Sequence, residues 1–333
     1  TEKNSLLNKI KYSVKMNIPY NLTSREQKQD NIQIEFFVTL SLEKNSSLVK
    51  VDIEVENRAI EHRVRVLFRT GIESVESIAD QQFGTIRRPV YLSEVENWRE
   101  NGWNEKPRTI EPMQSFVSLA NDHENISIIT DCVREYQITG EKFDTIALTL
   151  FRSTPEMGKA ELKDRPGRAS GMANWETPDA NLLKNLKFNF AISIGKNEYS
   201  ISKISNISKE YLTPFYYYQA AEFKNVDIFF LMNKPEIQDV PFDYSIFSSE
   251  NRNCILSTVK KAEKENALII RVYNPDDKKS TNFDIIYHDD IKNVSLVKFD
   301  EETIMDNVEF SFDKKEINIS EVKTCQALSI RIE

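Results

Sequence analysis

The segment 164 to 183, DRPGRASGMANWETPDANLL, gathers side chains that can bind a polar ligand but follows neither the strand period nor the helix period. Arg165 and Arg168 carry guanidinium groups, which donate paired hydrogen bonds to planar acceptors such as carboxylates. Long irregular loops are uncommon in compact domains unless they serve a function. We therefore expect Arg165, Arg168 and Trp175 to face a ligand. The alternative is that Arg165 pairs with a local acid such as Asp164 or Glu161 and that Trp175 fills a domain interface.

No catalytic centre can be recognised elsewhere in the chain. It has three histidines, and none has the close spacing of a zinc motif such as HExxH. His62 is in phase with Val64 and is read as a packed strand histidine. His123 falls in a turn, and His288 precedes two aspartates that are read as a solvated turn rather than a cation site. We assign no catalytic residue and no metal ligand.

Two further polar or aromatic segments carry weaker signals. Residues 80–90, DQQFGTIRRPV, combine an acid, two glutamines and two arginines beside a glycine. Consecutive tyrosines follow a proline at 216–218, and on a strand they would point to both faces. Both segments are expected to contact neighbouring domains or subunits rather than a ligand.

Composition excludes several classes of protein. The 333 residues are 40% hydrophobic and 29% charged, as in a soluble globular protein. A net charge of -8 argues against a nucleic-acid partner, which needs clustered basic residues. No apolar run approaches the ~20 residues that span a bilayer. Three widely separated cysteines fit free thiols in a reducing compartment, so we expect a cytoplasmic location.

Strict alternation of apolar and polar residues is the dominant pattern, for example over 49–55, 64–68, 186–194 and 328–332. Such alternation is typical of strands with one buried face. Convincing amphipathic helices of 12 residues or more are absent, and only short stretches such as 259–267 have helical composition. The pattern predicts an all-β protein. Prolines and weak periodicity near 240–246 predict two domains, 1–243 and 244–333.

Several segments, taken in order, resemble the C-terminal half of the family 38 α-mannosidases, in particular the bacterial mannosylglycerate-hydrolase-like branch. They are NRAIEHRVRVLFRTGIESVESIADQQFGTIRRPV, ENWRE, EKPRTIEPMQSFVSL, TIALTLFRS, the RPG...TPDA loop, ILSTVKKAEKENALIIRVYNPDDKKSTNFDI and EINISEVKTCQALSIRI. The resemblance runs from about residue 30 to the end. It implies a large galactose-mutarotase-like β-supersandwich followed by a small β-sandwich.

The resemblance also implies a function. Members are retaining, zinc-dependent exo-α-mannosidases whose nucleophile and zinc ligands lie in N-terminal domains. The chain starts without a methionine or a signal-peptide pattern, and we expect it to begin after those domains. It would then be a non-catalytic part that stabilises and partly lines the active site of a missing catalytic domain acting on a mannoside or a mannose-containing oligosaccharide. Zinc would belong to the parent enzyme, with no ligand in this chain.

Two alternatives remain open: a free carbohydrate-binding β-sandwich module, and a complete mutarotase-like enzyme. The scarcity of histidines weighs against the second. The sequence leaves the formation of a homo-oligomer open.

Overall fold

A computed structural model describes residues 1–132, 134–160, 162–167, 174–196, 199–217 and 243–333. The chain divides into two compact units, Thr1–Ser208 and Lys209–Glu333. Each unit is described by itself. The predicted domain boundary at residue 243 stays a prediction, because residues 218–242 lie outside the described part.

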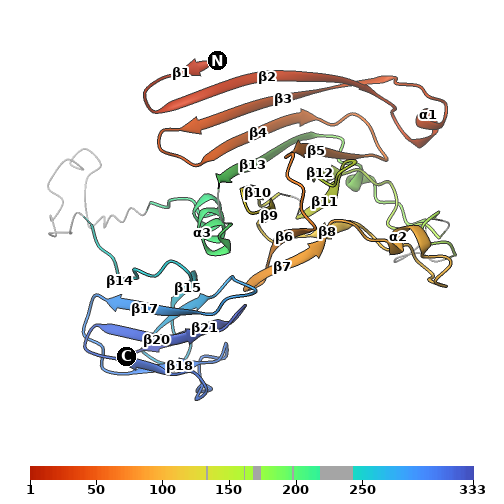
Figure 1. Cartoon of the computed structure of the whole chain (residues 1–333). Coiled ribbons are helices and arrows are strands. Elements are labelled where there is room, and N and C mark those ends of the chain that lie inside the picture. Colours follow the sequence, from red (N-terminus) through yellow and green to blue (C-terminus); the bar gives the residue numbers. More distant parts are fainter. Residues whose placement is uncertain (133, 161, 168–173, 197–198, 218–242) are drawn as a thin grey trace, which may run out of the picture. The chain divides into compact units, whose positions relative to one another are not determined.

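The first unit is a sandwich of two antiparallel sheets (Figure 1). Across the larger sheet the strands follow the order β1 (Glu2–Lys3), β2 (Leu7–Ile18), β3 (Ile32–Glu43), β4 (Leu48–Glu56), β13 (Asn185–Lys196), β10 (Glu124–Thr130), β9 (Phe116–Ala120), β6 (Glu76–Gln81) and β7 (Gly84–Pro89). The smaller sheet has the order β5 (Arg63–Arg69), β12 (Thr145–Arg152), β11 (Glu135–Thr139) and β8 (Ile110–Pro112).

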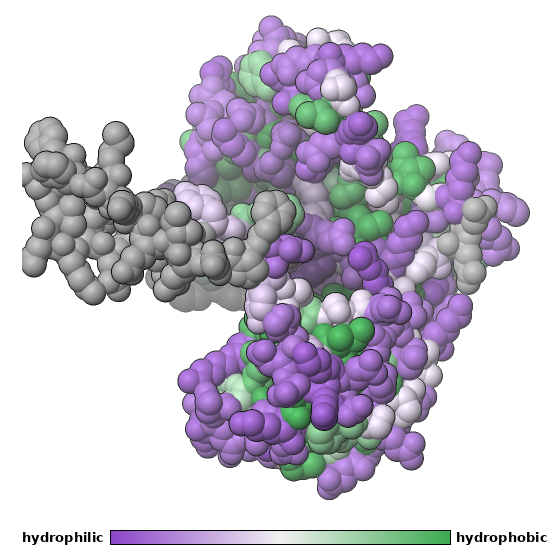
Figure 2. Space-filling view, turned by 90° about the vertical axis from the view of Figure 1, so that its left-hand side faces the viewer, coloured by the Kyte–Doolittle hydropathy of each residue, from purple (hydrophilic) through white to green (hydrophobic). Residues whose placement is uncertain are grey.

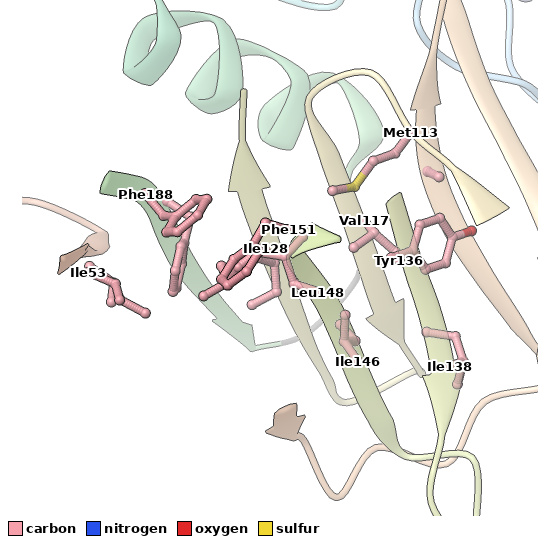
Figure 3. Packing of buried hydrophobic residues seen from close by; sticks show 14 of the residues in the cluster. Ile53, Met113, Val117, Ile128, Tyr136, Ile138, Ile146, Leu148, Phe151 and Phe188 are labelled. Carbon is pink, nitrogen blue, oxygen red and sulfur yellow. The ribbon is translucent and has the colours of Figure 1, made fainter. Parts of the chain in front are cut away.

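The core of this unit lies between the two sheets. Figure 3 shows Ile128 of β10, Leu148 and Phe151 of β12, and Phe188 of β13 directed toward one another. The alternation predicted for β13 is confirmed, since its core-facing residues join this cluster. Burial of apolar side chains at about 25 cal/mol per Å² is the main force that holds two such sheets together.

The first unit also contains three short helical segments: α1 (Leu22–Glu26), α2 (Glu94–Asn97) and the 3-10 helix η1 (Pro178–Asn181). A longer helix, α3 (Ile201–Leu212), contradicts the prediction that no helix of this length is present. Its buried side chains are Ile201, Ile204, Ser205 and Ser208, so its apolar residues do recur at helical spacing, but among many polar ones. Ser208 contacts the hydroxyl of Ser115 at 2.8 Å, which places the helix against a serine-lined part of the larger sheet.

The second unit is a smaller sandwich of two four-stranded sheets. One has the order β14 (Phe247–Ser248), β17 (Thr281–Tyr287), β20 (Glu316–Val322) and β19 (Phe310–Phe312), and the other β15 (Ile255–Lys261), β16 (Leu268–Tyr273), β21 (Ala327–Ile332) and β18 (Val294–Val297). Ile270, Phe283 and Ile330 are among its fully covered core residues. Residues 259–267, read as helical from composition, instead form the end of β15 and a turn.

An outer loop, residues 298–306, is fastened to this second unit by a buried carboxylate. Glu301 is only 8% exposed, and its carboxylate lies 2.9 Å from the ammonium group of Lys260 and 4.0 Å from the guanidinium group of Arg271. The backbone N–H of Glu263 donates to the same carboxylate at 3.1 Å. Arg331 donates to the carbonyl oxygen of Glu301. The loop is thus held by charge rather than by apolar packing alone.

The predicted fold class is confirmed: the chain is all-β and forms a large and a small sandwich. The face shown in Figure 2 is predominantly hydrophilic, with separate hydrophobic groups between the polar ones. None of the described helices is long and apolar enough to cross a membrane.

Candidate functional site

A cavity of about 780 Å³ opens in the first unit where β5 begins and β12 ends. The segment that follows β12 forms much of its wall through residues 153–159, Leu162 and Arg165. Charged side chains converge there from distant parts of the chain: Arg25, Arg63, Arg108, Arg152, Lys159 and Arg165 are basic, and Glu61, Glu135 and Glu156 are acidic. In a chain whose net charge is -8, this excess of cations favours an acidic or hydroxyl-rich ligand.

Glu135 organises the cations on one wall of the cavity. Arg152 lies 2.8 Å and Arg63 3.6 Å from its carboxylate, and the Thr149 hydroxyl donates to it at 2.7 Å. Burial is the strongest single influence on Glu135 and acts to raise its pKa. The hydrogen bonds from Thr149 and Arg152 and the two positive charges outweigh burial, so the pKa is lowered. The carboxylate is therefore ionised at neutral pH and holds two guanidinium groups in place.

Replacing Glu135 with glutamine is expected to lower the free energy of unfolding of the first unit by about 1–2 kcal/mol at pH 7, because two arginines lose their counter-ion. This loss of stability is smaller than that from breaking a fully buried ion pair, because Arg152 is half-exposed. Because the pKa of Glu135 is lowered in the folded state, its carboxylate stabilises the folded protein fully at pH values above the unfolded-state pKa of about 4.3. The difference in stability between wild type and Glu135→Gln should therefore vanish as the pH falls through the folded-state pKa. Urea unfolding at several pH values measures this. Glu54→Gln, which breaks an exposed pair with Lys187, is the control and should change little.

His62 lies beside this charged wall as a neutral, packed group. Its ring meets that of Phe151 edge-on at 5.4 Å, and burial lowers its pKa. The backbone of Ile60 opposes this lowering, and the charge of Arg25 adds to it. Both ring nitrogens are buried without a normal hydrogen-bond partner among the described residues. The imidazole lines the cavity with its ring, while both of its nitrogens are covered.

Arg165, the first predicted site residue, is placed on the cavity wall. Of the two local acids named as alternative partners of Arg165, Asp164 is held by Arg108 at 2.9 Å, and its carbonyl oxygen accepts the backbone N–H of Lys106. Glu161, the other acid, lies outside the described residues, so the pairing of Arg165 with a local acid stays open. The loop is therefore anchored to the segment that precedes β8. Its anchoring fixes the start of the loop at the rim of the cavity.

Trp175, the second predicted site residue, does not line the cavity but lies directly behind its wall. Residues 174–177 run antiparallel to 155–158: the N–H of Met157 donates to the Trp175 carbonyl oxygen at 2.9 Å, and that of Asn174 to Gly158. The indole side chain is 53% exposed. Arg168, the third predicted residue, lies outside the described residues.

The first of the two weaker segments, residues 80–90, makes contacts within the first unit, and its expected contact with a neighbouring domain or subunit stays a prediction. Asp80 is buried and accepts a hydrogen bond from Ser115. Arg88 donates to the Pro112 carbonyl oxygen and pairs with Glu111 at 3.1 Å. Neither residue contributes to the cavity.

The other aromatic and histidine candidates lie apart from the cavity. Tyr216 and Tyr217 are almost fully exposed, and Tyr218 lies outside the described residues. In the second unit, the ring of His288 packs against Tyr244 at 4.7 Å and lies 3.4 Å from the carboxylate of Asp289.

The described residues hold no group of three His, Cys, Asp or Glu side chains placed to bind a metal ion. The histidines are distributed between the cavity, a turn and the second unit. These residues therefore do not fit the zinc that the resemblance implies for a parent enzyme, and we derive no step through a metal.

Most of the cavity could not be found by reading the sequence. Glu135, Arg152 and Arg63 are brought together only by the pairing of β5, β12 and β11, and no local motif marks them. Arg25 arrives from α1, far earlier in the chain. The signal that could have pointed to these residues is an arginine at the end of a strand. This signal is not specific, because the chain has many such arginines.

Comparison with known proteins assigns both units. Residues 8–156 match the glycosyl hydrolases family 38 C-terminal domain, and residues 253–325 match the glycosyl hydrolases family 38 C-terminal beta sandwich domain. A curated relative from Halalkalibacterium halodurans, described as "Putative mannosylglycerate hydrolase", is 24% identical over 282 residues, which are 83% of this chain and 28% of that protein.

Two solved structures share the fold. An alpha-mannosidase from Enterococcus faecalis V583 superposes with a TM-score of 0.75 at 16% identity, covering 100% of this chain and 34% of that one. A family 38 glycosyl hydrolase from Enterococcus faecalis gives a TM-score of 0.73 at 15% identity, covering 100% and 36%. The chain thus spans about a third of the length of these relatives.

Proposed function

Because the chain belongs to glycosyl hydrolase family 38, of which it carries the C-terminal domains, we propose that it is the non-catalytic part of a retaining, zinc-dependent exo-α-mannosidase. In this proposal it supports a catalytic N-terminal domain and supplies one wall of the active site. The observation that carries it is the cation-lined cavity, whose rim is formed by the loop with Arg165. The substrate class is a mannoside or a mannose-containing oligosaccharide.

The cavity is suited to binding rather than to bond cleavage. A retaining glycosidase needs a nucleophilic carboxylate and a second acid/base carboxyl group about 5 Å apart. Glu135 is committed to Arg63, Arg152 and Thr149, and so is a poor nucleophile. Guanidinium groups, by contrast, donate hydrogen bonds to sugar hydroxyls or to a carboxylate on the leaving group. The chemistry is therefore assigned to the partner domain.

Alanine substitution of the predicted residues in the complete enzyme tests this proposal. Arg165→Ala is expected to raise KM for an aryl α-mannoside at least tenfold, because a charge-assisted hydrogen bond to the substrate contributes about 1.5–3 kcal/mol. Trp175→Ala should have a smaller, few-fold effect, since its side chain lies behind the wall. Lys187→Ala, on the outer face of β13, is the matched control and should leave kcat/KM unchanged.

Wild-type kinetics in both loop variants would contradict the assignment of this wall. Stoichiometric zinc binding and mannoside hydrolysis by residues 1–333 alone would contradict the non-catalytic role.

A second function, that of a free carbohydrate-binding module, is favoured by one observation: the indole of Trp175, which does not line the cavity, is 53% exposed. Aromatic rings provide apolar platforms against which sugar rings can pack. Calorimetric titration of residues 1–333 with mannose-containing glycans distinguishes the two functions. Tight binding without the catalytic domain supports the module, and its absence supports the active-site wall.

A further inference from the structure

Strand β2 alternates as a half-buried strand does, although the described residues leave one side of it uncovered. Its residues Ile10, Tyr12, Val14 and Met16, here named the β2 stripe, point to one face, and polar residues occupy the positions between them. The stripe side chains are 41–50% exposed. An apolar set of this kind on one strand face is the pattern of a face that packs against another layer.

The β2 stripe continues the core face of the larger sheet. Tyr12 stands opposite Val38 on β3, Val38 opposite Ile53 on β4, and Ile53 opposite Phe188 on β13. Side chains directly opposite each other on adjacent strands share a face. Along this row the exposed fraction of the residue falls from 47% at Tyr12 to 8% at Val38, 6% at Ile53 and 7% at Phe188.

The smaller sheet therefore covers β4 and β13 but does not reach β2. The row through Val14 repeats the trend, with Val14 41% and Val55 3% exposed. In Figure 1, β2 lies at the margin of the larger sheet, with β3 and β4 between it and β13. A contiguous apolar extension of a core face marks a surface that another body covers.

The backbone edge of β2 carries features that disfavour the addition of another strand, whereas its apolar face carries none. β1 pairs with only Asn8 and Lys9, so the backbone from Ile10 onward is open among the described strands. Lysines on an edge strand are a common protection against edge-to-edge pairing. Lys11 and Lys15 alternate with the stripe on the opposite face, and two β2 edges paired about Ser13 would bring these lysines opposite each other. This arrangement disfavours a second copy joined through β2.

We propose that the β2 stripe is the docking surface for the N-terminal part of the longer family 38 chain; this inference rests on the proposed function. The matched domains are C-terminal ones, and about two thirds of the length of each relative lies outside the part that this chain matches. The match to the family 38 C-terminal domain begins at residue 8, within β2, so the stripe belongs to the part of that domain that directly follows the N-terminal part in the longer chains. The surface offered is apolar on the inner face and basic on the outer face, so the partner presents an apolar patch.

Hydrogen exchange tests the proposal on the wild-type protein. The backbone amides of residues 10–16 are measured in the chain of residues 1–333 and in the same residues with the N-terminal part present, on one polypeptide or as a separate chain. We expect exchange at least tenfold slower when the N-terminal part is present. Equal exchange in the two samples overturns the proposal, whatever the hydrolytic activity of either.

A pair of variants separates docking from internal packing. Val14→Glu should lower the thermal midpoint of the complete protein by several degrees and leave that of residues 1–333 within about one degree. Ser13→Glu, its neighbour on the opposite face, should change neither. An equal loss in both samples would show that the stripe belongs to the internal core, and a dimer of residues 1–333 that Val14→Glu dissociates would show that a second copy covers it. Either result overturns the proposal.

The outcome is independent of the test of function. A complete protein that protects β2 but keeps full activity in the Arg165 and Trp175 variants would contradict the proposed active-site wall and retain the docking surface. The reverse combination would contradict the docking surface alone.

Discussion

Replacing Phe190 with alanine is expected to lower the free energy of unfolding of the first unit by about 4 kcal/mol, the range found for large-to-small changes of buried aromatic residues. Phe190 is 1% exposed, and its ring meets that of Phe68 edge-on at 5.6 Å. It lies on β13, opposite Val51 of β4 and Thr130 of β10. The cavity left behind has sheet on every side and cannot collapse without disturbing the ladder.

Calorimetry measures this effect and tests the division into two units at the same time. For a unit of this size, 4 kcal/mol corresponds to a fall of roughly 10 °C in the unfolding midpoint. Phe37→Ala, on the outer face of β3 and 56% exposed, is the matched control and should shift the midpoint by only a few degrees. We expect two transitions, of which Phe190→Ala moves only one. Movement of both together would contradict independent unfolding of the units.

The second large effect is expected at Glu301 in the other unit. Glu301→Gln should lower its free energy of unfolding by about 2–3 kcal/mol at pH 7, because Lys260 and Arg271 keep their charges without the carboxylate that offsets them. Glutamine retains an acceptor for the Glu263 N–H, so the loss of stability measures the contribution of the charge and not that of the hydrogen bond to Glu263. In calorimetry, Glu301→Gln should shift only the transition of the second unit, which Phe190→Ala leaves unchanged.

The pH dependence of the Glu301 effect has a definite sign. The hydrogen bond from Lys260 lowers the pKa of Glu301 against the opposing effect of burial. A lowered folded-state pKa gives stability that is complete above the unfolded-state value of about 4.3 and is lost as the pH falls through the folded-state pKa. The difference between wild type and Glu301→Gln should therefore shrink below about pH 4. Glu302→Gln, which breaks an exposed pair with Lys264, is the control and should stay close to wild type throughout.

The strands were predictable because their signal is local. The alternating segments 49–55, 64–68, 186–194 and 328–332 all fall within strands β4, β5, β13 and β21. The twelve-residue helix α3 carries isoleucines at helical spacing, of which Ile201 and Ile204 are buried, and was missed because polar residues outnumber them. Tyr199, two residues before it, donates to Ser118 at 2.8 Å. Hydrogen bonds of this kind add to the packing of the helix and leave no period in the sequence.

The candidate site was predictable only where one segment supplies it. Composition marked the loop that carries Arg165, and the structure places that residue on the cavity wall. It could not reveal that Glu135 would collect Arg63 and Arg152, since those contacts depend on strand register over some 70 residues. Trp175 was assigned to the site by residue type, and its backbone rather than its side chain meets the wall.

The position of β13 sets an order of events during synthesis. This strand, residues 185–196, pairs on one side with β4 and on the other with β10. The N-terminal meander β2–β3–β4 can close its ladders as soon as it leaves the ribosome, because those pairings are local. The larger sheet, however, stays in two pieces until residue 196 has been made. Such late, long-range pairing slows folding and leaves two open strand edges exposed in the nascent chain, where they are most at risk of pairing with the wrong neighbour.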